Sequence, residues 1–458
     1  MKTILGDTLP SASVILKEHD TLPFLTRLPS VINRAVRLNN AATTPPFEAT
    51  LRAVSQFLKT YGALHRGAGP FATETCKAVE RAVSCISRFF GLTNEHTMLF
   101  TSNTSSAINL FARLLTWQPT DVVLLSSIEH TSNHLPWLYN CRAKAVYVDS
   151  LPDGSLDLAD LAQKLKEHRG RVKLVVLTGA SNLSGYVPNL THISRLAHQA
   201  GAFLFVDAAQ LAPHRPIDMK KQSIDALAFS AHKVYAPFGL GVLALPKSYL
   251  SQIPKDPGGG SIDMISDDTI LWAPPEVRHQ AGTWNATGII ALASSLSTLH
   301  KCRWPRIIEH ERQLVRYALR RMSKIPGLTL HVAPEKYLRE DRIGTIPFNL
   351  NGYHHALLSA ILEHEYGIET RAGTICNHRL VRRWLAVSDA EQKRIEREIQ
   401  KGNRLASYGI VRASIGIHNT EKDIDALVDA LKKVAQHGPR LSYEPVLEEE
   451  TYVSVGRR

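Results

Sequence analysis

The chain has 458 residues, of which 44% are hydrophobic and 21% are charged, and its formal net charge is +12. This composition is typical of a folded globular enzyme and argues against a disordered chain. The sequence contains no run of about 18 apolar residues and begins without a basic stretch followed by an apolar block, so we expect no membrane span, no secretory signal and a cytoplasmic protein.

The distribution of charge and the number and spacing of the cysteines limit which partners, disulfides and metal sites are predicted. Basic residues are spread along the chain without the aromatic-basic alternation of nucleic-acid-binding sheets, so no nucleic-acid partner is predicted. A phosphate cofactor, a carboxylate substrate or an acidic partner protein would also suit this charge. The five cysteines are odd in number and show no CxxC spacing, which predicts neither a disulfide framework nor a metal site.

Short apolar runs alternate with amphipathic helical patterns through the first half of the chain. The runs predicted as strands are residues 98–101, 122–125, 145–148, 174–177, 203–206, 226–229 and 241–245. Helical patterns lie between most of them, for example at residues 107–115, 156–167 and 191–200. Nearly continuous apolar strands are typical of a sheet buried on both faces. We therefore predict an α/β fold with a mainly parallel seven-stranded sheet covered by helices.

The rest of the chain predicts a second domain. Residues 254–260 are rich in glycine and proline and indicate a loop that leaves the large domain. A long helical stretch at residues 289–324 then leads into a smaller α/β unit. We expect four parts. These are an N-terminal segment packing with the small domain (1–37), a large ligand-binding domain (38–288), a linking helix with the small C-terminal domain (289–437) and a peripheral tail (438–458).

An acid and a lysine follow neighbouring strands of the predicted sheet. Asp207 ends the run at 203–206, and Lys233 lies in a polar turn after the run at 226–229. Ligands of open α/β sheets bind beyond the carboxyl ends of the strands. A carboxylate can hold a pyridine nitrogen protonated, and an unprotonated lysine amine can form a Schiff base with an aldehyde, so this pair suggests pyridoxal phosphate. Taken alone, Asp207 could cap a helix and Lys233 could be a solvated loop lysine.

Other polar groups follow the same strands. Residues 102–106 are rich in hydroxyls and precede a helical pattern, which suits a phosphate, although helix capping alone would account for one hydroxyl. His130 follows the second strand and could stack on a ring or move a proton. Asn182 and Gln210 follow the fourth and fifth strands, and Ser230 and His232 stand beside Lys233.

These motifs together resemble a known family. They are LNNAATT at 38–44, HRGA at 65–68, the segment 100–109, EHTSN at 129–133, VDAAQ at 206–210, FSAHK at 229–233, AGT at 281–283, RAG at 371–373, and RAS at 412–414 with Asn419 and Thr420. In order and spacing they are similar to the class V aminotransferase family of fold-type I pyridoxal-phosphate enzymes. The resemblance covers about residues 38 to 436 and points to the cysteine desulfurase and selenocysteine lyase group.

The resemblance implies a role for each matched residue. Lys233 corresponds to the Schiff-base lysine, Asp207 to the partner of the pyridine nitrogen, and His130 to the residue stacked over the ring and a proton carrier. The implied phosphate contacts are Thr104, Ser105, Ser230 and His232, with Thr283 supplied by the neighbouring subunit of a homodimer. Asn182 and Gln210 would contact the ring oxygen or the substrate carboxylate, and His65 and Arg412 are matched as substrate-binding residues. For Arg412 alone, a surface ion pair would be the default interpretation.

The predicted reaction depends on whether Cys376 is a nucleophile. Desulfurases place a nucleophilic cysteine shortly after an Arg-x-Gly motif, and Cys376 keeps that spacing after Arg371. The alternative is an inert buried thiol. The chain departs from the desulfurase pattern at Thr374 and Ile375, which replace histidines, at Trp284, which replaces a proline, and in the long segment 377–410.

The predicted function is removal of sulfur from L-cysteine or a related thiol or selenol amino acid through a persulfide on Cys376, with a sulfur-acceptor protein as a further partner. The alternative is a C–S lyase, epimerase or aminotransferase reaction on a specialised amino acid, in which Cys376 is incidental. A partner protein that has kept the fold but lost catalysis is a third interpretation. The intact set of Asp207, His130 and Lys233 argues against it.

Overall fold

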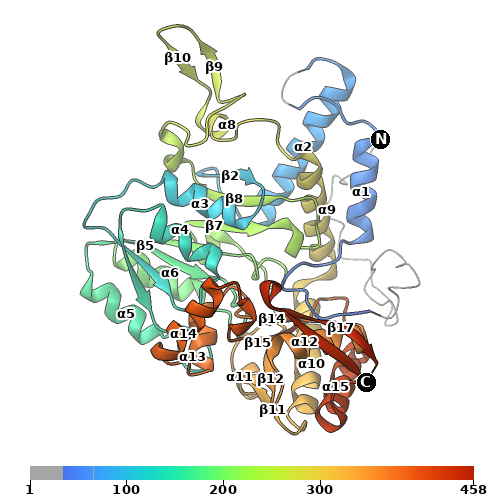
Figure 1. Cartoon of the computed structure of the whole chain (residues 1–458). Coiled ribbons are helices and arrows are strands. Elements are labelled where there is room, and N and C mark those ends of the chain that lie inside the picture. The colour runs from blue at the N-terminus through green and yellow to red at the C-terminus, as the bar shows by residue number, and fades with distance from the viewer. Residues whose placement is uncertain (1–34, 65–66, 458) are drawn as a thin grey trace.

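The computed structural model describes residues 35–64 and 67–457. Within these residues a central sheet of seven strands has the order β2-β8-β7-β6-β5-β3-β4 (Figure 1). Strand β8 runs antiparallel to both of its neighbours, and the remaining pairs are parallel. The strands are β2 (His96–Thr101), β3 (Val122–Ser126), β4 (Lys144–Val148), β5 (Val172–Thr178), β6 (Phe203–Asp207), β7 (Ala226–Ser230) and β8 (Gly241–Pro246). All seven predicted runs lie inside these strands, so the predicted α/β fold is confirmed.

The two faces of this sheet bury different side chains, as the alternation along a strand requires. On one face Val123, Leu125 and Phe205 pack with α3 (Thr104–Leu114) and with Trp137 of α4 (Leu135–Tyr139). On the other face Leu124 and Val206 pack with a larger group of helices. That group is α1 (Glu48–Leu58), α2 (Pro70–Phe89), α5 (Leu158–Glu167), α6 (Leu190–Gln199) and α9 (Ala286–Cys302).

Side-chain caps set the starts of the helices that follow the strands. Asn103 accepts a hydrogen bond from the Ser106 amide, so α3 begins at Thr104, three residues before the predicted start. Asp157 accepts from two amides at the start of α5. Shorter elements complete the connections, namely α7 (Met219–Gln222) and the 3-10 turns η1 (Thr131–Asn133), η2 (Ala231–Lys233) and η3 (Lys247–Ser251).

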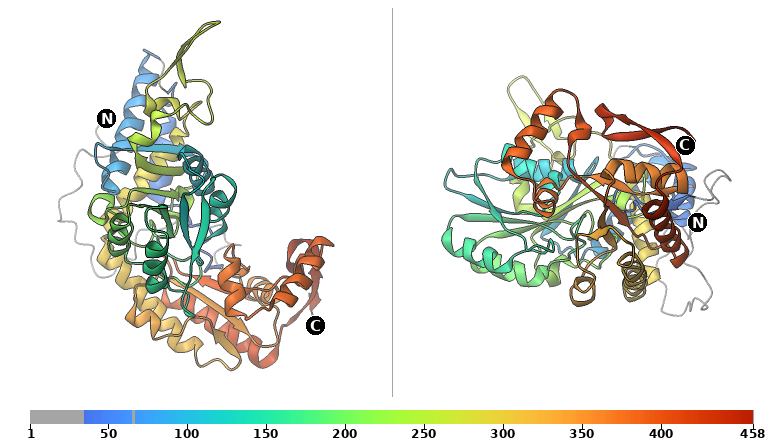
Figure 2. Two further views of the ribbon diagram at one scale, coloured as in Figure 1. Left: turned by 90° about the vertical axis from the view of Figure 1, so that its left-hand side faces the viewer. Right: turned by 60° about the horizontal axis from the view of Figure 1, so that its bottom comes forward.

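The small domain is an antiparallel sheet of order β11-β12-β15-β14 with helices packed against it. Its strands are β11 (Leu328–Leu330), β12 (Thr345–Leu350), β14 (Arg371–Gly373) and β15 (Ile410–Ser414). Its helices are α10 (Trp304–Met322), α11 (Lys336–Arg339), α12 (His355–Tyr366), α13 (His378–Trp384), α14 (Asp389–Gln400) and α15 (Glu421–His437), with a 3-10 turn η4 (Arg404–Ala406). Figure 2 shows this domain curving under one end of the large domain. The predicted helical stretch 289–324 is two helices, because Arg303 has a left-handed φ of 63° between α9 and α10.

The ends of the described chain join the small domain. β1 (Val36–Arg37) pairs in parallel with β13 (Ile368–Glu369), and the predicted segment 1–37 otherwise lies outside the described residues. The segment predicted as a peripheral tail forms a hairpin of β16 (Leu441–Val446), η5 (Leu447–Glu449) and β17 (Thr451–Arg457), which contacts α12. A second hairpin, β9 (Ile262–Ile265) with β10 (Ile270–Trp272), projects from the large domain before α8 (Pro275–Arg278).

A buried ion-pair cluster fixes the two domains against each other. Glu311 of α10 contacts His214 at 2.6 Å and Arg215 at 2.7 Å, and it accepts a hydrogen bond from the Gly344 amide. These cationic partners lower the pKa of Glu311 to about 2 despite its burial. In the described part of the chain, no helix is long and apolar enough to span a membrane, and no cluster of three acidic, histidine or cysteine side chains could hold a metal ion.

Candidate active site

A cavity of about 290 Å³ lies at the carboxyl ends of the large-domain strands. It is lined by Asn103, Thr104, Ser105, His130, Ser132, Thr178, Asn182, Asp207, Ala209, Gln210, Ser230, His232 and Lys233. Residues from five separate strand ends therefore meet in one place, as expected for a sheet of this kind.

Lys233 and Asp207 both line this cavity, and the charge of each affects the pKa of the other. Asp207 is 4% exposed, its Oδ1 accepts a hydrogen bond of 2.9 Å from the Ala209 amide, and burial raises the pKa of its carboxyl group against the effects of that bond and of Lys233. Burial lowers the pKa of the Lys233 ammonium, and Arg412 lowers it further, against the opposing charges of Asp207 and Cys376. A lysine with a lowered pKa supplies more of the neutral amine, which is the nucleophilic form.

Hydroxyl groups gather at the N-terminus of α3, at one end of the cavity. Ser230 accepts a hydrogen bond from the Thr104 amide at 2.7 Å, and its Oγ lies 2.5 Å from Thr104 Oγ1. Ser105 Oγ lies 2.6 Å from Ser132 Oγ. Hydroxyls clustered at a helix N-terminus form a suitable binding site for a phosphate.

His130 and Glu129 occupy the loop after β3. His130 Nδ1 accepts a hydrogen bond from the Ser132 amide, which leaves the ring proton on Nε2. Burial lowers the pKa of His130 to about 3, and Lys233, Arg412 and His378 add to this effect. Glu129 is buried behind it, accepts hydrogen bonds from Ser126, Asn133 and the Thr178 amide, and has a pKa raised by burial to about 8. At neutral pH both groups are therefore mainly uncharged.

The opposite wall of the cavity comes from residues far apart in the chain. Gln210 donates from Nε2 to the Ala41 carbonyl at 2.6 Å, and its buried Oε1 has no hydrogen-bond partner among the described residues. His232 Nδ1 lies 3.1 Å from Thr43 Oγ1, and burial beside Lys233 lowers the pKa of His232 to about 4. A buried polar atom without a partner at a cavity wall indicates a place for a bound polar group. The hydroxyl cluster, the Asp207 carboxylate and this amide fit pyridoxal phosphate.

Arg412 lies in β15 and is 2% exposed. It donates to the Asn182 carbonyl at 3.0 Å and to Asn39 Oδ1 at 3.2 Å, and in the described residues it forms no ion pair with a carboxylate. Burial lowers its pKa to about 9, so the guanidinium stays charged at neutral pH. A buried cation without an anionic partner is costly, which favours a role in binding an anionic substrate group.

Cys376 lies in a strained loop after β14. Ile375 and Cys376 have φ angles of 50° and 56°, a left-handed conformation that is rare for non-glycine residues and especially for a β-branched one. The Cys376 carbonyl accepts from the Thr131 amide at 2.8 Å, and the Ile375 carbonyl accepts from Asn182 Nδ2 at 2.9 Å. The loop is thus held next to His130, and the charge of Cys376 acts on both Lys233 and Arg412.

Among the predicted site residues that the structure describes, Thr283, Arg412 and Cys376 do not line this cavity, and several lining residues were not predicted. Thr283 is exposed in the loop before α9, and His65 lies outside the described residues. Asn103, Ser132, Thr178 and Ala209 line the cavity without having been assigned a role. Their positions in the sequence could have indicated them, because each stands just after a predicted strand or close to a residue with a predicted role. Asn182 lines the cavity, but its side-chain amide binds the Ile375 carbonyl.

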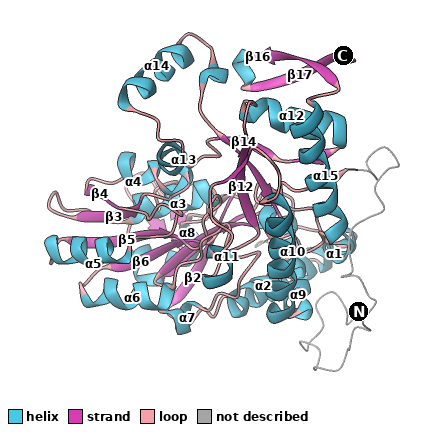
Figure 3. Ribbon diagram, turned by 90° about the horizontal axis from the view of Figure 1, so that it is seen from below, coloured by secondary structure: helices cyan, strands magenta, loops and turns pink. Residues whose placement is uncertain are grey.

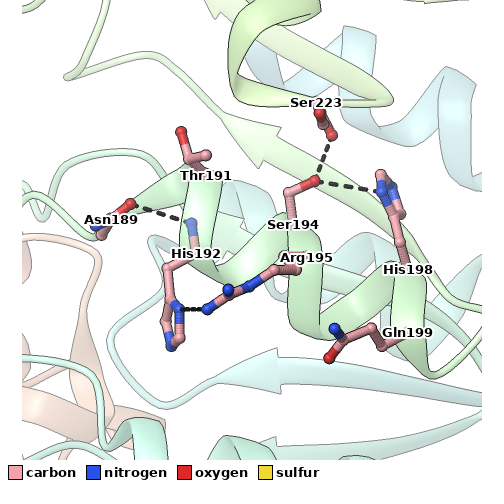
Figure 4. Close-up of a pocket in the computed structure, with 8 residues that line it drawn as sticks. All are labelled: Asn189, Thr191, His192, Ser194, Arg195, His198, Gln199 and Ser223. Atoms are coloured by element: carbon pink, nitrogen blue, oxygen red, sulfur yellow. Dashed lines mark hydrogen bonds between the residues drawn. The ribbon is translucent and has the colours of Figure 1, made fainter.

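A larger and shallower depression lies on the outer face of α6 (Figure 4). Its polar groups already bond to one another. Arg195 bonds to His192, and Ser194 donates to the Ser223 carbonyl. His198 pairs with Asp225 at 2.7 Å. None of the residues predicted to carry chemistry lines it, so the strand-end cavity is the candidate active site.

Comparison with known proteins agrees with this geometry. The family model described as Aminotransferase class-V matches residues 36–427. A probable cysteine desulfurase of Halalkalibacterium halodurans is 30% identical over 410 residues, which cover 88% of this chain and 93% of that protein. The crystal structure of the cysteine desulfurase CsdA from Escherichia coli aligns with a TM-score of 0.71 at 29% identity, covering 87% of this chain and 94% of that one. The apo structure of a cysteine desulfurase from Thermococcus onnurineus gives a TM-score of 0.77 at 25% identity, covering 90% and 99%.

Proposed function

This chain belongs to the class-V aminotransferase family as a cysteine desulfurase-like enzyme, and from that membership we propose that it uses pyridoxal phosphate to remove sulfur from L-cysteine or a related thiol or selenol amino acid. Cys376 receives the sulfur as a persulfide. The observation that carries this proposal is the docking of the Cys376 carbonyl on the Thr131 amide, one residue from His130. The hydrogen bond joins the loop of the nucleophile to the loop that lines the cofactor cavity.

The cofactor is held by residues of the large domain. Bound pyridoxal phosphate supplies an aldehyde for covalent attachment to an amine and a ring that accepts electrons from bonds at the substrate α-carbon. Thr104, Ser105 and Ser230 would hold its phosphate with their hydroxyl groups. Asp207 would hold the pyridine nitrogen, and His130 would contact the ring in its neutral form, since its pKa is near 3.

The substrate is oriented by Arg412 and its protons are moved by Lys233. The buried guanidinium of Arg412 binds the substrate carboxylate with two parallel donors, a geometry that a lysine cannot offer. Burial lowers the pKa of Lys233, so its neutral amine can accept and return a proton. These two residues together fix which bonds of the amino acid face the ring.

The sulfur step takes place at Cys376. Its thiolate forms an S–S bond with the substrate sulfur while the carbon–sulfur bond breaks. The electron pair of the broken bond stays with the substrate carbon, which takes up a proton, so the products are alanine and a persulfide on Cys376. The cysteine sulfur is oxidised and the substrate carbon is reduced by the same two electrons.

Two parts of the proposal extend beyond this chain. Thr283 is exposed on the loop before α9 and outside its own cavity, which suits a contact with the phosphate in the neighbouring subunit of a homodimer. The persulfide must also be passed on, so we include a sulfur-acceptor protein or a small thiol as the recipient.

Product analysis tests the proposal. With L-cysteine as substrate, the wild type and a Cys141→Ala control should release alanine, and Cys376→Ala should release little. Cys141 is a suitable control because it is a half-buried thiol whose pKa is raised by burial, and it hydrogen-bonds to the Trp137 carbonyl. Full alanine release by Cys376→Ala, or pyruvate as the main product of all three proteins, would assign the chain to a lyase or another reaction.

A further inference from the structure

The C-terminal hairpin lies beyond the segment that the family model matches. The match ends at residue 427, whereas β16 and β17 occupy residues Leu441–Val446 and Thr451–Arg457. The hairpin contacts α12 and lies on the side of the small domain where β14 ends (Figure 3). It therefore packs on α12 of the small domain, which itself contacts β14, the strand that precedes the Cys376 loop.

One carboxylate of this hairpin reaches the end of β14. Glu450, at the tip beside η5, has a left-handed φ of 53°. A Cβ atom added at Gly373 would lie 3.0 Å from Glu450 Oε1, so the carboxylate fills the space that glycine leaves open. The same oxygen lies 3.9 Å from His355 Nε2, and among the described residues it has no hydrogen-bond partner.

The backbone beneath this carboxylate is tightly packed. A Cβ atom added at Gly409 would lie 2.5 Å from the Gly373 Cα atom and 2.7 Å from His355 Nε2. Gly373 itself has a φ of 103°, which strains any other residue. Gly373 is thus held between β15 on one side and Glu450 on the other. Cys376 follows three residues later.

The burial of Glu450 is unfavourable for stability. Desolvation raises the pKa of its carboxyl group, against the attraction of Arg371 and Arg404. A raised pKa in the folded state means that folding favours the protonated form, so the charged form present at neutral pH reduces stability. A partly buried carboxylate oxygen that has no hydrogen-bond partner among the described residues, and that lies against the last residue of β14, suits a role in placing the loop that follows.

We propose that Glu450 is a positioning residue for Cys376, and that the C-terminal hairpin braces the end of β14 so that the strained loop presents the thiol to the substrate sulfur. Thr131 and Asn182 hold the loop from the large domain, and Glu450 holds its start from the small domain. This inference rests on the proposed function, because the persulfide step is the step that Glu450 serves.

The charge of Glu450 is the property that the brace depends on. The groups that face it are Arg371 from β14, Arg404 from η4, and His355 at the start of α12, whose ring contacts that of His354. As pH falls through the raised pKa of Glu450, its carboxylate is neutralised and its attraction to the two arginines is lost. The rate of the persulfide step should therefore decline at a higher pH than it would if it depended on a glutamate with an ordinary pKa.

The experiment compares Glu450→Gln with Glu449→Gln, an exposed carboxylate one residue away on the same hairpin. Both variants are studied as full chains loaded with pyridoxal phosphate. Persulfide formation with L-cysteine should fall about tenfold in Glu450→Gln, since a shift of the nucleophile by a fraction of an ångström lowers the rate steeply. Its decline on acidification should disappear, while its melting temperature should be unchanged or higher and its absorbance change with cysteine unaltered. Glu449→Gln should match the wild type in all four measurements.

Alkylation by iodoacetamide separates this inference from the proposed function. The rate at which Cys376 is alkylated reports its placement without requiring any turnover, and it should differ at least about threefold between Glu450→Gln and Glu449→Gln. If the wild type forms no persulfide but alkylation changes, the proposed function is wrong and the positioning role stands. If Glu450→Gln forms persulfide and is alkylated as fast as Glu449→Gln, the positioning role is wrong.

Discussion

The two sides of the candidate active site are held in different ways. On the large-domain side, several polar groups are paired with one another, as Thr104 is with Ser230 and Glu129 with Asn133, while Gln210 Oε1 has no partner among the described residues. On the small-domain side, Ile375 and Cys376 are in strained conformations and Arg412 forms no ion pair with a carboxylate of the described chain. Paired groups can bind a cofactor without rearranging, and strained or unpaired groups suit contacts with a substrate, which is the division of roles that we propose.

This difference predicts that substitutions on the two sides fail in different ways. A change on the large-domain side should remove cofactor attachment and with it all chemistry. A change on the small-domain side should leave the cofactor in place and impair substrate binding or sulfur transfer.

The largest effect is expected for Lys233→Ala. Loss of the amine removes both the covalent attachment and the proton carrier, so turnover should fall by about 10³-fold or more. The absorbance of the bound cofactor should no longer be fixed to the protein by borohydride, and sulfide release should stop. Lys220→Ala, on an exposed lysine of α7, should behave as the wild type. Retention of the borohydride-fixed label in Lys233→Ala would move the attachment to another lysine.

A smaller loss is expected for Arg412→Ala, and it should be confined to the amino acid. Removal of a bidentate contact with a carboxylate should cost about 1.5–3 kcal/mol of binding free energy. Cofactor content should be unchanged, and the spectral titration with cysteine should shift to higher concentrations. Arg412→Lys should recover only part of the affinity, because the ammonium lacks the planar pair of donors. An unchanged titration in Arg412→Ala would exclude this residue as the carboxylate contact.

Asn182→Ala sharpens the comparison, because Asn182 belongs to the large domain and binds the small-domain loop. Loss of its hydrogen bond to the Ile375 carbonyl should cost about 1 kcal/mol of loop placement and slow persulfide formation several-fold. Cofactor absorbance should remain as in the wild type and in Asn189→Ala, which changes a capping residue of α6. If cofactor affinity fell and persulfide formation per bound cofactor did not, Asn182 would belong with the cofactor contacts.

The smallest effect concerns His130, whose ring we expect not to take up a proton between pH 8 and 5. With a pKa near 3, its ring should stay neutral between pH 8 and 5, so its ring-proton NMR signal, assigned by its loss in His130→Asn, should not move. The unfolded chain takes up a proton near the ordinary pKa of 6.5 and the folded chain does not. This histidine therefore lowers stability as pH falls below about 6.5. A midpoint near 6.5 in the folded protein would show that His130 is not buried as described.

Much of the large domain could be predicted from the sequence because its signals are local. All seven strands are short apolar runs, and Asp207, Lys233 and the hydroxyls of α3 stand directly after them. The strand-end rule for α/β sheets then brings them together without further information. The break at Arg303 was missed although Pro305 follows it closely, because the apolar periodicity continues on both sides.

The small-domain side depends on contacts that local sequence does not encode. The backbone preference of isoleucine does not predict the left-handed conformation of Ile375. The hydrogen bonds that Asn182 and Thr131 make with this loop impose it. The contact of Asn182 with a ring oxygen or a carboxylate stays a prediction, and the bond of its amide to the Ile375 carbonyl was not predicted. Glu450 and Gly373 are 77 positions apart in the sequence and approach each other because residues 441–457 form a hairpin. The sequence of that segment predicts only a polar tail.

The most direct test of the central claim is mass spectrometry of the peptide that contains Cys376 after the cofactor-loaded protein has been treated with L-cysteine. This peptide should gain the mass of one sulfur atom, a thiol reductant should remove the gain, and one alanine should be released for each sulfur bound. A protein that consumes cysteine while the Cys376 peptide keeps its original mass and pyruvate accumulates would contradict this claim.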